Sequence, residues 1–100
     1  MKGYSRSWKK HNRIMYGTVE ITKGWDTWYK LSEEMKPEME AVGMKFLFKG
    51  CEMDEKKVHV IMEVESMEKA KEFSSNPEVN ARRVEAGVVV ESTVMIPLKD

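Results

Sequence analysis

The sequence predicts a single α+β domain in which four strands form one antiparallel sheet and helices cover one face of it. Two observations carry this prediction. Apolar and polar residues alternate in three segments, a fourth strand-like segment is apolar on both sides, and segments with helical spacing follow the first and the third of these four. The chain of 100 residues has room for one such domain, and its apolar runs are far shorter than the roughly 20 residues of a membrane span.

The first strand is predicted over residues 14–21, where Met15 and Val19 lie on one side and Tyr16 and Thr18 on the other. The strand therefore has one apolar and one mixed face.

The first helix is predicted from Trp25 to Val42, because apolar residues recur there at steps of three and four. Gly43 is expected to end it, since glycine readily adopts the left-handed conformation of a helix C-terminus. Pro37 removes one backbone hydrogen bond, so a kink or a restart of the helix is expected near Lys36.

A hairpin follows this helix. Its strands are predicted over residues 44–51 and 58–65, with Met44, Phe46 and Phe48 on the side that faces the helices. In both strands one face is almost wholly apolar, which is typical of a sheet covered on one side.

The second helical region has two parts. Ser66 is predicted to cap a helix over residues 67–73, because its hydroxyl can accept a hydrogen bond from a first-turn amide. Asn76 and Pro77 are expected to start a second helical segment, which Gly87 ends.

The last strand is predicted over residues 88–96, and Pro97 is expected to stop further pairing because proline has no backbone N–H. The strand is apolar on both sides. It should therefore place one of two pairs on the sheet face away from the helices, either Val89 with Met95 or Val90 with Val94.

These elements in this order make a split βαβ arrangement, the ferredoxin-like topology. Both crossovers are long enough for right-handed connections, so the helices should cover the same face. The other face would expose Tyr16, Leu47 and Ile61 among charged residues. Because an exposed apolar patch usually marks an interface, we expect a second copy of the chain to cover this face in a homodimer.

Four segments have a recognisable pattern: Gly24-Trp25-Asp26-Thr27-Trp28, Val42-Gly43, Asn76-Pro77-Glu78-Val79 and Glu91-Ser92-Thr93-Val94-Met95-Ile96-Pro97-Leu98. With the βαββαβ order, they resemble small proteins of the dimeric α+β barrel superfamily over about residues 14–98. That superfamily includes antibiotic-biosynthesis-type monooxygenases, polyketide cyclases, haem-degrading enzymes and stress-responsive barrel proteins. The resemblance implies a dimeric barrel that holds a small apolar or aromatic ligand between helices and sheet, inside each subunit.

On this resemblance, the ligand site has an expected lining. Its residues are Trp25, Trp28, Met35, Met39, Phe46, Phe48 and Met62. Nine methionines in 100 residues are many, and flexible thioethers suit a pocket for a long or irregular apolar molecule. The alternative is that these side chains are ordinary core packing. Arg82 and Arg83 could meet the anionic end of such a ligand, or they could be solvent-exposed helix charges.

His59 is a candidate for proton transfer, because histidine titrates near neutral pH. It should share the helix-free face with Glu63 and with Tyr16. These three side chains could serve as base, orienting group and hydrogen-bond donor in a cofactor-free monooxygenase or cyclase. The alternative is a histidine held by cross-strand hydrogen bonds in the dimer interface.

The chain departs from two enzyme patterns of the resembled superfamily. The cofactor-free monooxygenases tend to use an asparagine with a tryptophan near the pocket, whereas Asn12, Asn76 and Asn80 fall outside the predicted strands. The haem-degrading relatives bind iron through a helical histidine, whereas His11 and His59 fall outside the predicted helices.

Seventeen basic and seventeen acidic residues balance, so the whole chain has no general attraction for nucleic acid or anionic lipid. Residues 1–13 nevertheless hold five basic residues and no acidic one, which divides the chain into a basic arm, 1–13, and a domain, 14–100. With Tyr4 and Trp8, the arm could follow a nucleic-acid strand, but we expect a mobile N-terminal extension that can fold against the acidic body of a partner. A structural or interaction module is thus a third hypothesis.

A single cysteine, Cys51, excludes an internal disulfide and fits a reducing compartment, so a cytoplasmic location is expected; a bridge between two copies is the alternative. One cysteine and two distant histidines do not supply the ligands of a metal site. Phosphate-binding glycine loops and nucleophile motifs are absent from the sequence. We therefore expect no cofactor, no metal and no membrane association.

Overall fold

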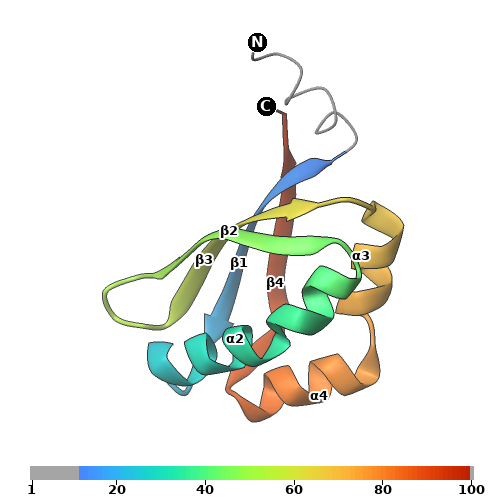
Figure 1. Ribbon diagram of the computed structural model, residues 1–100. Coiled ribbons are helices and arrows are strands. Elements are labelled where there is room, and N and C mark those ends of the chain that lie inside the picture. Colours follow the sequence, from blue (N-terminus) through green and yellow to red (C-terminus); the bar gives the residue numbers. More distant parts are fainter. Residues whose placement is uncertain (1–11, 100) are drawn as a thin grey trace.

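Four strands and three helices make up residues 12–99, the part of the chain that the computed structural model describes (Figure 1). In chain order they are β1 (Arg13–Ile21), α2 (Trp25–Ala41), β2 (Met44–Cys51), β3 (Lys57–Val64), α3 (Met67–Ser74), α4 (Pro77–Glu85) and β4 (Val88–Leu98). Most of the basic arm lies outside the described residues, so its role stays a prediction. No helix within residues 12–99 combines the length and the hydropathy needed to cross a lipid bilayer.

The strands pair antiparallel in the order β2-β3-β1-β4, and the helices pack along one side of the sheet (Figure 1). The predicted ferredoxin-like βαββαβ topology is confirmed. Alternation explains which side is covered, because Met15 and Val19 of β1 and Val58 and Val60 of β3 are buried beneath the helices.

Two polar side chains fix the starts of the shorter helices, as predicted. Ser66 Oγ accepts a hydrogen bond from the Lys69 amide at 3.2 Å. Asn76 Oδ1 accepts from the amides of Glu78 and Val79 at 2.8 and 3.3 Å. These contacts satisfy amides that lack partners at a helix N-terminus.

Helix α2 runs through Pro37 as one element, so the restart expected near Lys36 does not occur. Burial on both sides of Pro37 accounts for this, because tertiary packing supplies most of a helix's stability and outweighs one lost hydrogen bond. Gly43, at φ +76°, follows the end of the helix as predicted. The buried stripe of α2 consists of Trp28, Leu31, Ser32, Met35 and Met39.

A β-bulge at Leu47 changes the direction in which the second half of β2 points. The register shifts between Phe46, which pairs with Met62, and Phe48, which pairs with Ile61. Phe48 therefore lies on the helix-free face, where it is 57% exposed. The prediction that Phe48 faces the helices is wrong, because one extra residue in a strand reverses the alternation after it.

A larger irregularity interrupts the pairing of β4 with β1. Glu20 pairs with Val89, and Thr18 pairs with Val94. The stretch of β4 between these two pairs is therefore three residues longer than the matching stretch of β1. Ser92 Oγ stabilises this segment by accepting from the Glu20 amide at 2.8 Å and donating to the Val89 carbonyl at 2.6 Å. Val89 and Val94 both lie on the helix-free face as a result. Neither predicted pair occurs, because an odd number of extra residues reverses the alternation.

Strand β4 also continues past the predicted end at Ile96. Pro97 pairs in register with Met15, and Leu98 pairs with Ile14. The expectation that Pro97 stops pairing is wrong, since β4 is an edge strand, where a missing N–H can face outward.

Candidate functional site

A cavity of about 510 Å³ lies between the helices and the sheet. All three helices and all four strands contribute to its lining. Apolar side chains in its walls include Val19, Trp28, Leu31, Phe46, Val60, Phe73 and Val79. The cavity is open to solvent, and its exposed lining residues are Lys71 and Ser74 on α3 and Met95 and Pro97 on β4.

Methionine is the most frequent residue in these walls. Seven of the nine methionines of the chain line the cavity: Met15, Met35, Met39, Met44, Met62, Met67 and Met95. Met53, by contrast, is 100% exposed in the hairpin loop. Because unbranched thioether side chains repack easily, these walls can adapt to the shape of an occupant.

Gly17 on β1 makes room for Met95 on β4. The two residues pair in register, and a Cβ placed at Gly17 would lie 2.5 Å from Met95 Sδ and 3.2 Å from Val60 Cγ2. A larger residue at this position would therefore displace Met95 from its place over the sheet.

The structure brings five of the seven predicted lining residues to the cavity. They are Trp28, Met35, Met39, Phe46 and Met62. Trp25 is not among the lining residues; it stacks on Trp28 with ring centroids 5.4 Å apart. Phe48 lies on the other face of the sheet because of the bulge. The contributions of α3 and α4, such as Phe73 and Val79, were not predicted, although apolar spacing in these helices was an available signal.

Arg83 is the cationic residue that α4 contributes to the cavity lining. Its Nη1 donates to Asn80 Oδ1 at 3.2 Å, and its Nη2 donates to Thr93 Oγ1 at 3.0 Å. Both acceptors are neutral, and no carboxylate within residues 12–99 forms an ion pair with Arg83. Partial burial lowers the pKa of the Arg83 guanidinium.

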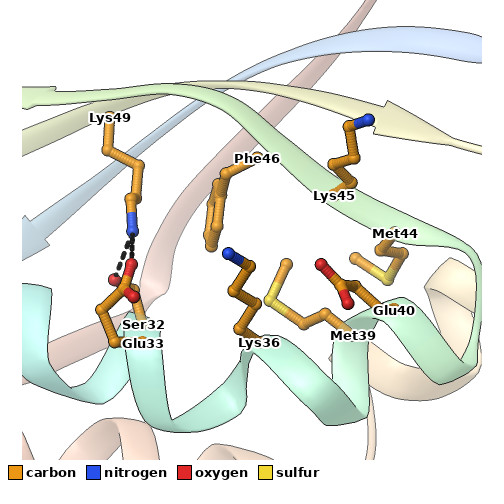
Figure 2. A pocket seen from close by; sticks show the side chains of 9 residues that line it. All are labelled: Ser32, Glu33, Lys36, Met39, Glu40, Met44, Lys45, Phe46 and Lys49. Carbon is orange, nitrogen blue, oxygen red and sulfur yellow. Dashed lines mark hydrogen bonds and ion pairs between the residues drawn. The ribbon is translucent and has the colours of Figure 1, made fainter.

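A smaller hollow of about 310 Å³ lies between α2 and β2 (Figure 2). Lys49 points into it from β2, because the bulge at Leu47 turns this side chain toward α2. Lys49 Nζ lies 2.6 Å from Glu33 Oε2, donates to Ser32 Oγ at 3.0 Å, and sits 4.3 Å from the centroid of the Tyr29 ring. These contacts hold the ammonium group between strand and helix, so we assign this hollow a structural role.

On the helix-free face, three side chains form a hydrogen-bonded line. Tyr16 Oη lies 2.6 Å from His59 Nδ1, and His59 Nε2 lies 2.9 Å from Glu52 Oε2. His59 and Tyr16 therefore meet, but the carboxylate beside them is Glu52 of the hairpin loop and not Glu63. Glu63 is buried and accepts instead from Asn12 Nδ2 at 3.0 Å. In the described part of the chain, no three His, Cys, Asp or Glu side chains cluster as metal ligands would.

The same face carries an apolar row that crosses the whole sheet. Phe48 pairs with Ile61, Ile61 pairs with Tyr16, and Tyr16 pairs with Ile96. We call these four residues the cross-strand row. Its two ends are open to solvent, since Phe48 is 57% and Ile96 is 45% exposed.

Solved structures share this fold. The chain matches the structural-genomics protein YjcS with a TM-score of 0.60 and 16% identity, over 88% of this chain and 98% of that one. Rv0793 from Mycobacterium tuberculosis matches with a TM-score of 0.58 and 11% identity, over 89% of this chain and 94% of that one. A third match is a protein from Nitrosomonas europaea that is provisionally described as an antibiotic biosynthesis monooxygenase. Its TM-score is 0.53 and its identity 10%, over 90% of each chain. At such identities the likeness shows the fold alone. No family model and no curated protein matches the sequence.

Proposed function

Given this ferredoxin-like fold, we propose that the protein is a homodimer that binds a small apolar molecule, fatty-acid-like or aromatic, in the cavity between helices and sheet. The observation that carries the proposal is the cavity itself. Its volume of about 510 Å³ falls within the range of roughly 300 to 1,000 Å³ that is usual for ligand pockets.

The chemistry of the walls supports an apolar occupant. The cavity is open to solvent, and methionine, valine and aromatic side chains make up most of its walls. Transfer of apolar surface from water into such a site is favourable by about 25 cal/mol for each Å² buried. A compact apolar molecule is therefore the occupant that fits these walls best.

The cross-strand row supports the homodimer. Burying a large apolar side chain completely stabilises a protein by about 1.5 to 3 kcal/mol, and the row offers four such side chains on a face without helices. A two-fold axis through this face would set the row of one subunit against the row of the other. The proposed interface thus uses the surface that a single copy leaves uncovered.

An obstructing substitution tests the ligand site. Ala70 lines the cavity from α3, and Ala70→Leu adds bulk there with only a small loss of helix propensity. Ala81→Leu makes the same change at an exposed position of α4 and is the matched control. We expect wild type and Ala81→Leu to bind 1-decanol in a calorimetric titration, and Ala70→Leu to bind it at least about tenfold more weakly.

Either of two results would count against the ligand site. One is that wild type binds neither 1-decanol nor any other chain or ring compound of similar size, acid or alcohol. The other is equal binding by wild type and a folded Ala70→Leu variant.

A second candidate function is a cofactor-free monooxygenase or cyclase that uses His59, and the 2.6 Å contact between Tyr16 Oη and His59 Nδ1 favours it. His59 lies between the Tyr16 phenol and the Glu52 carboxylate, and such a hydrogen-bonded line can pass a proton. This line lies on the helix-free face, so in the proposed dimer it would sit between the subunits. The test is turnover of a panel of phenols, followed as dioxygen uptake: His59→Ala and Tyr16→Phe should both lose activity. Unchanged turnover by both variants excludes this function.

A further inference from the structure

We propose that Arg83 anchors the carboxylate of an amphipathic ligand whose apolar part fills the cavity between the helices and the sheet. This inference rests on the proposed function and adds the chemical class of the ligand, an organic acid with an apolar chain or ring.

Two neighbouring arginines of α4 have different surroundings. Arg82 Nη1 lies 2.8 and 2.7 Å from the two carboxylate oxygens of Glu38, so a carboxylate of α2 neutralises Arg82. Arg83 lines the cavity instead, and its partners are the neutral Asn80 and Thr93. Within residues 12–99, the cation in the cavity wall thus has no counter-charge, whereas its neighbour on the surface does.

The guanidinium of Arg83 has donors to spare. Arginine carries five N–H donors in a planar fork, and two hydrogen bonds to protein acceptors are formed within the described chain. The fork matches the two oxygens of a carboxylate, and such charge-assisted pairs are about twice as strong as neutral hydrogen bonds. Partial burial lowers the pKa of Arg83, consistent with a cation that water solvates poorly.

The charged residues of the cavity lining also favour an anionic group on the ligand. Lys71, exposed at the opening, is the second charged residue of the cavity, and no aspartate or glutamate of residues 12–99 contributes to its walls. A ligand's carboxylate near the opening would meet positive charge alone, and the hydroxyl groups of Ser74 and Thr93 lie in the same lining. The apolar walls beyond would receive the rest of the molecule.

Matched acids and alcohols test this inference on the intact protein. Decanoate and 1-decanol share one chain, and 2-naphthoate and 2-naphthalenemethanol share one ring, so each pair isolates the carboxylate. We expect wild type to bind at least one acid about 10- to 100-fold more tightly than its alcohol at pH 7.5, because hydrogen bonds to charged groups are among the stronger ones. Which acid binds more tightly tells whether the occupant is a chain or a ring.

The variants are Arg83→Met, which retains an unbranched apolar stem, and the surface control Arg82→Met. Arg83→Met should weaken binding of the acid far more than binding of the alcohol and so remove the preference for the acid, while Arg82→Met should preserve the preference. Arg83→Lys, which keeps the charge but loses the fork, should show an intermediate preference.

The outcomes separate the two proposals. If the alcohols bind to wild type but neither acid binds more tightly than its alcohol, the cavity proposal stands and the anchoring role of Arg83 is wrong. The anchoring role is equally wrong if a folded Arg83→Met variant keeps the preference for the acid. If no acid or alcohol binds to wild type, the cavity proposal fails, and the anchor fails with it. If Arg83→Met does not fold, Arg83→Lys takes its place, and an acid preference in Arg83→Lys as large as that of wild type would refute the anchoring role.

Discussion

The Tyr16 hydroxyl lies 2.6 Å from His59 Nδ1, and Glu52 Oε2 lies 2.9 Å from the other ring nitrogen. All three side chains are satisfied if Tyr16 donates to Nδ1 and the neutral ring carries its proton on Nε2, facing the carboxylate.

The predicted tautomer can be read from ¹⁵N NMR at pH 8. In a His11→Gln background, which leaves His59 as the one histidine of the chain, we expect the signals of an Nε2–H ring. Glu52→Ala should weaken this preference because it removes the acceptor of the Nε2 proton. Glu68→Ala, an exposed change on α3, should leave it unchanged. A dominant Nδ1–H ring in the reference protein would contradict the described line.

The proposed dimer makes a prediction about the cross-strand row. Ile96→Glu places a carboxylate beside Tyr16, where a partner subunit would have to desolvate it, so we expect the dissociation constant of the dimer to rise at least about tenfold. Met53→Glu, in the exposed hairpin loop, is the control and should associate as wild type does. Sedimentation velocity measures both. A wild-type chain that stays monomeric at high concentration would refute the interface.

The contact between Lys49 and Glu33 predicts a pH effect on stability. The hydrogen bond and the charge of Lys49 lower the pKa of the Glu33 carboxyl from its ordinary value of 4.5. A lowered folded-state pKa means that the contribution is complete above pH 4.5 and disappears as the pH falls through the folded-state value. Glu33→Gln should therefore lower the urea midpoint at pH 7, and the difference from wild type should shrink as the pH falls below 4.5. Glu34→Gln, without an ion pair in residues 12–99, is the control. If Glu33→Gln and wild type differed in urea midpoint by the same amount at pH 7 and below pH 4.5, the ion pair would not be the cause of the difference.

Cys51 is predicted to be an unreactive thiol. Partial burial, together with the negative charges of Glu55, Asp54 and Glu52, raises the pKa of Cys51 above its ordinary value of 9.0. Since the thiolate is the reactive form, iodoacetamide should label the native protein at pH 8 more slowly than it labels the same protein in urea. The native rate should also keep rising above pH 9. Faster labelling of the native protein would show that the thiol is activated instead.

The fold could be predicted because regular alternation and helical spacing depend on local sequence. β1 and β3 show this, since Met15, Val19, Val58 and Val60 all lie on the predicted side. The two strand irregularities could not be predicted in the same way. An inserted residue such as Leu47 leaves the composition of the strand unchanged, yet it sends Phe48 to the helix-free face and Lys49 to α2.

The site was partly predictable for a related reason. The stripe of α2 placed Trp28, Met35 and Met39 toward the sheet, and they line the cavity. Sequence spacing does not give the distance between a helix and the sheet, so the size of the cavity could not be derived from it. Nothing in the sequence indicated that Glu52 contacts His59, because Glu52 lies in a loop whose path depends on the whole hairpin.

Binding in the cavity can be observed directly through its methionines. In a protein labelled with ¹³C at the methionine methyl groups, titration with 1-decanol should shift the signals of Met35, Met62 and the other lining methionines together and to saturation. The signal of Met53, which is fully exposed, should stay in place. Unchanged signals from the lining methionines, or a shift of Met53 as large as theirs, would contradict the proposal that this cavity is a ligand site.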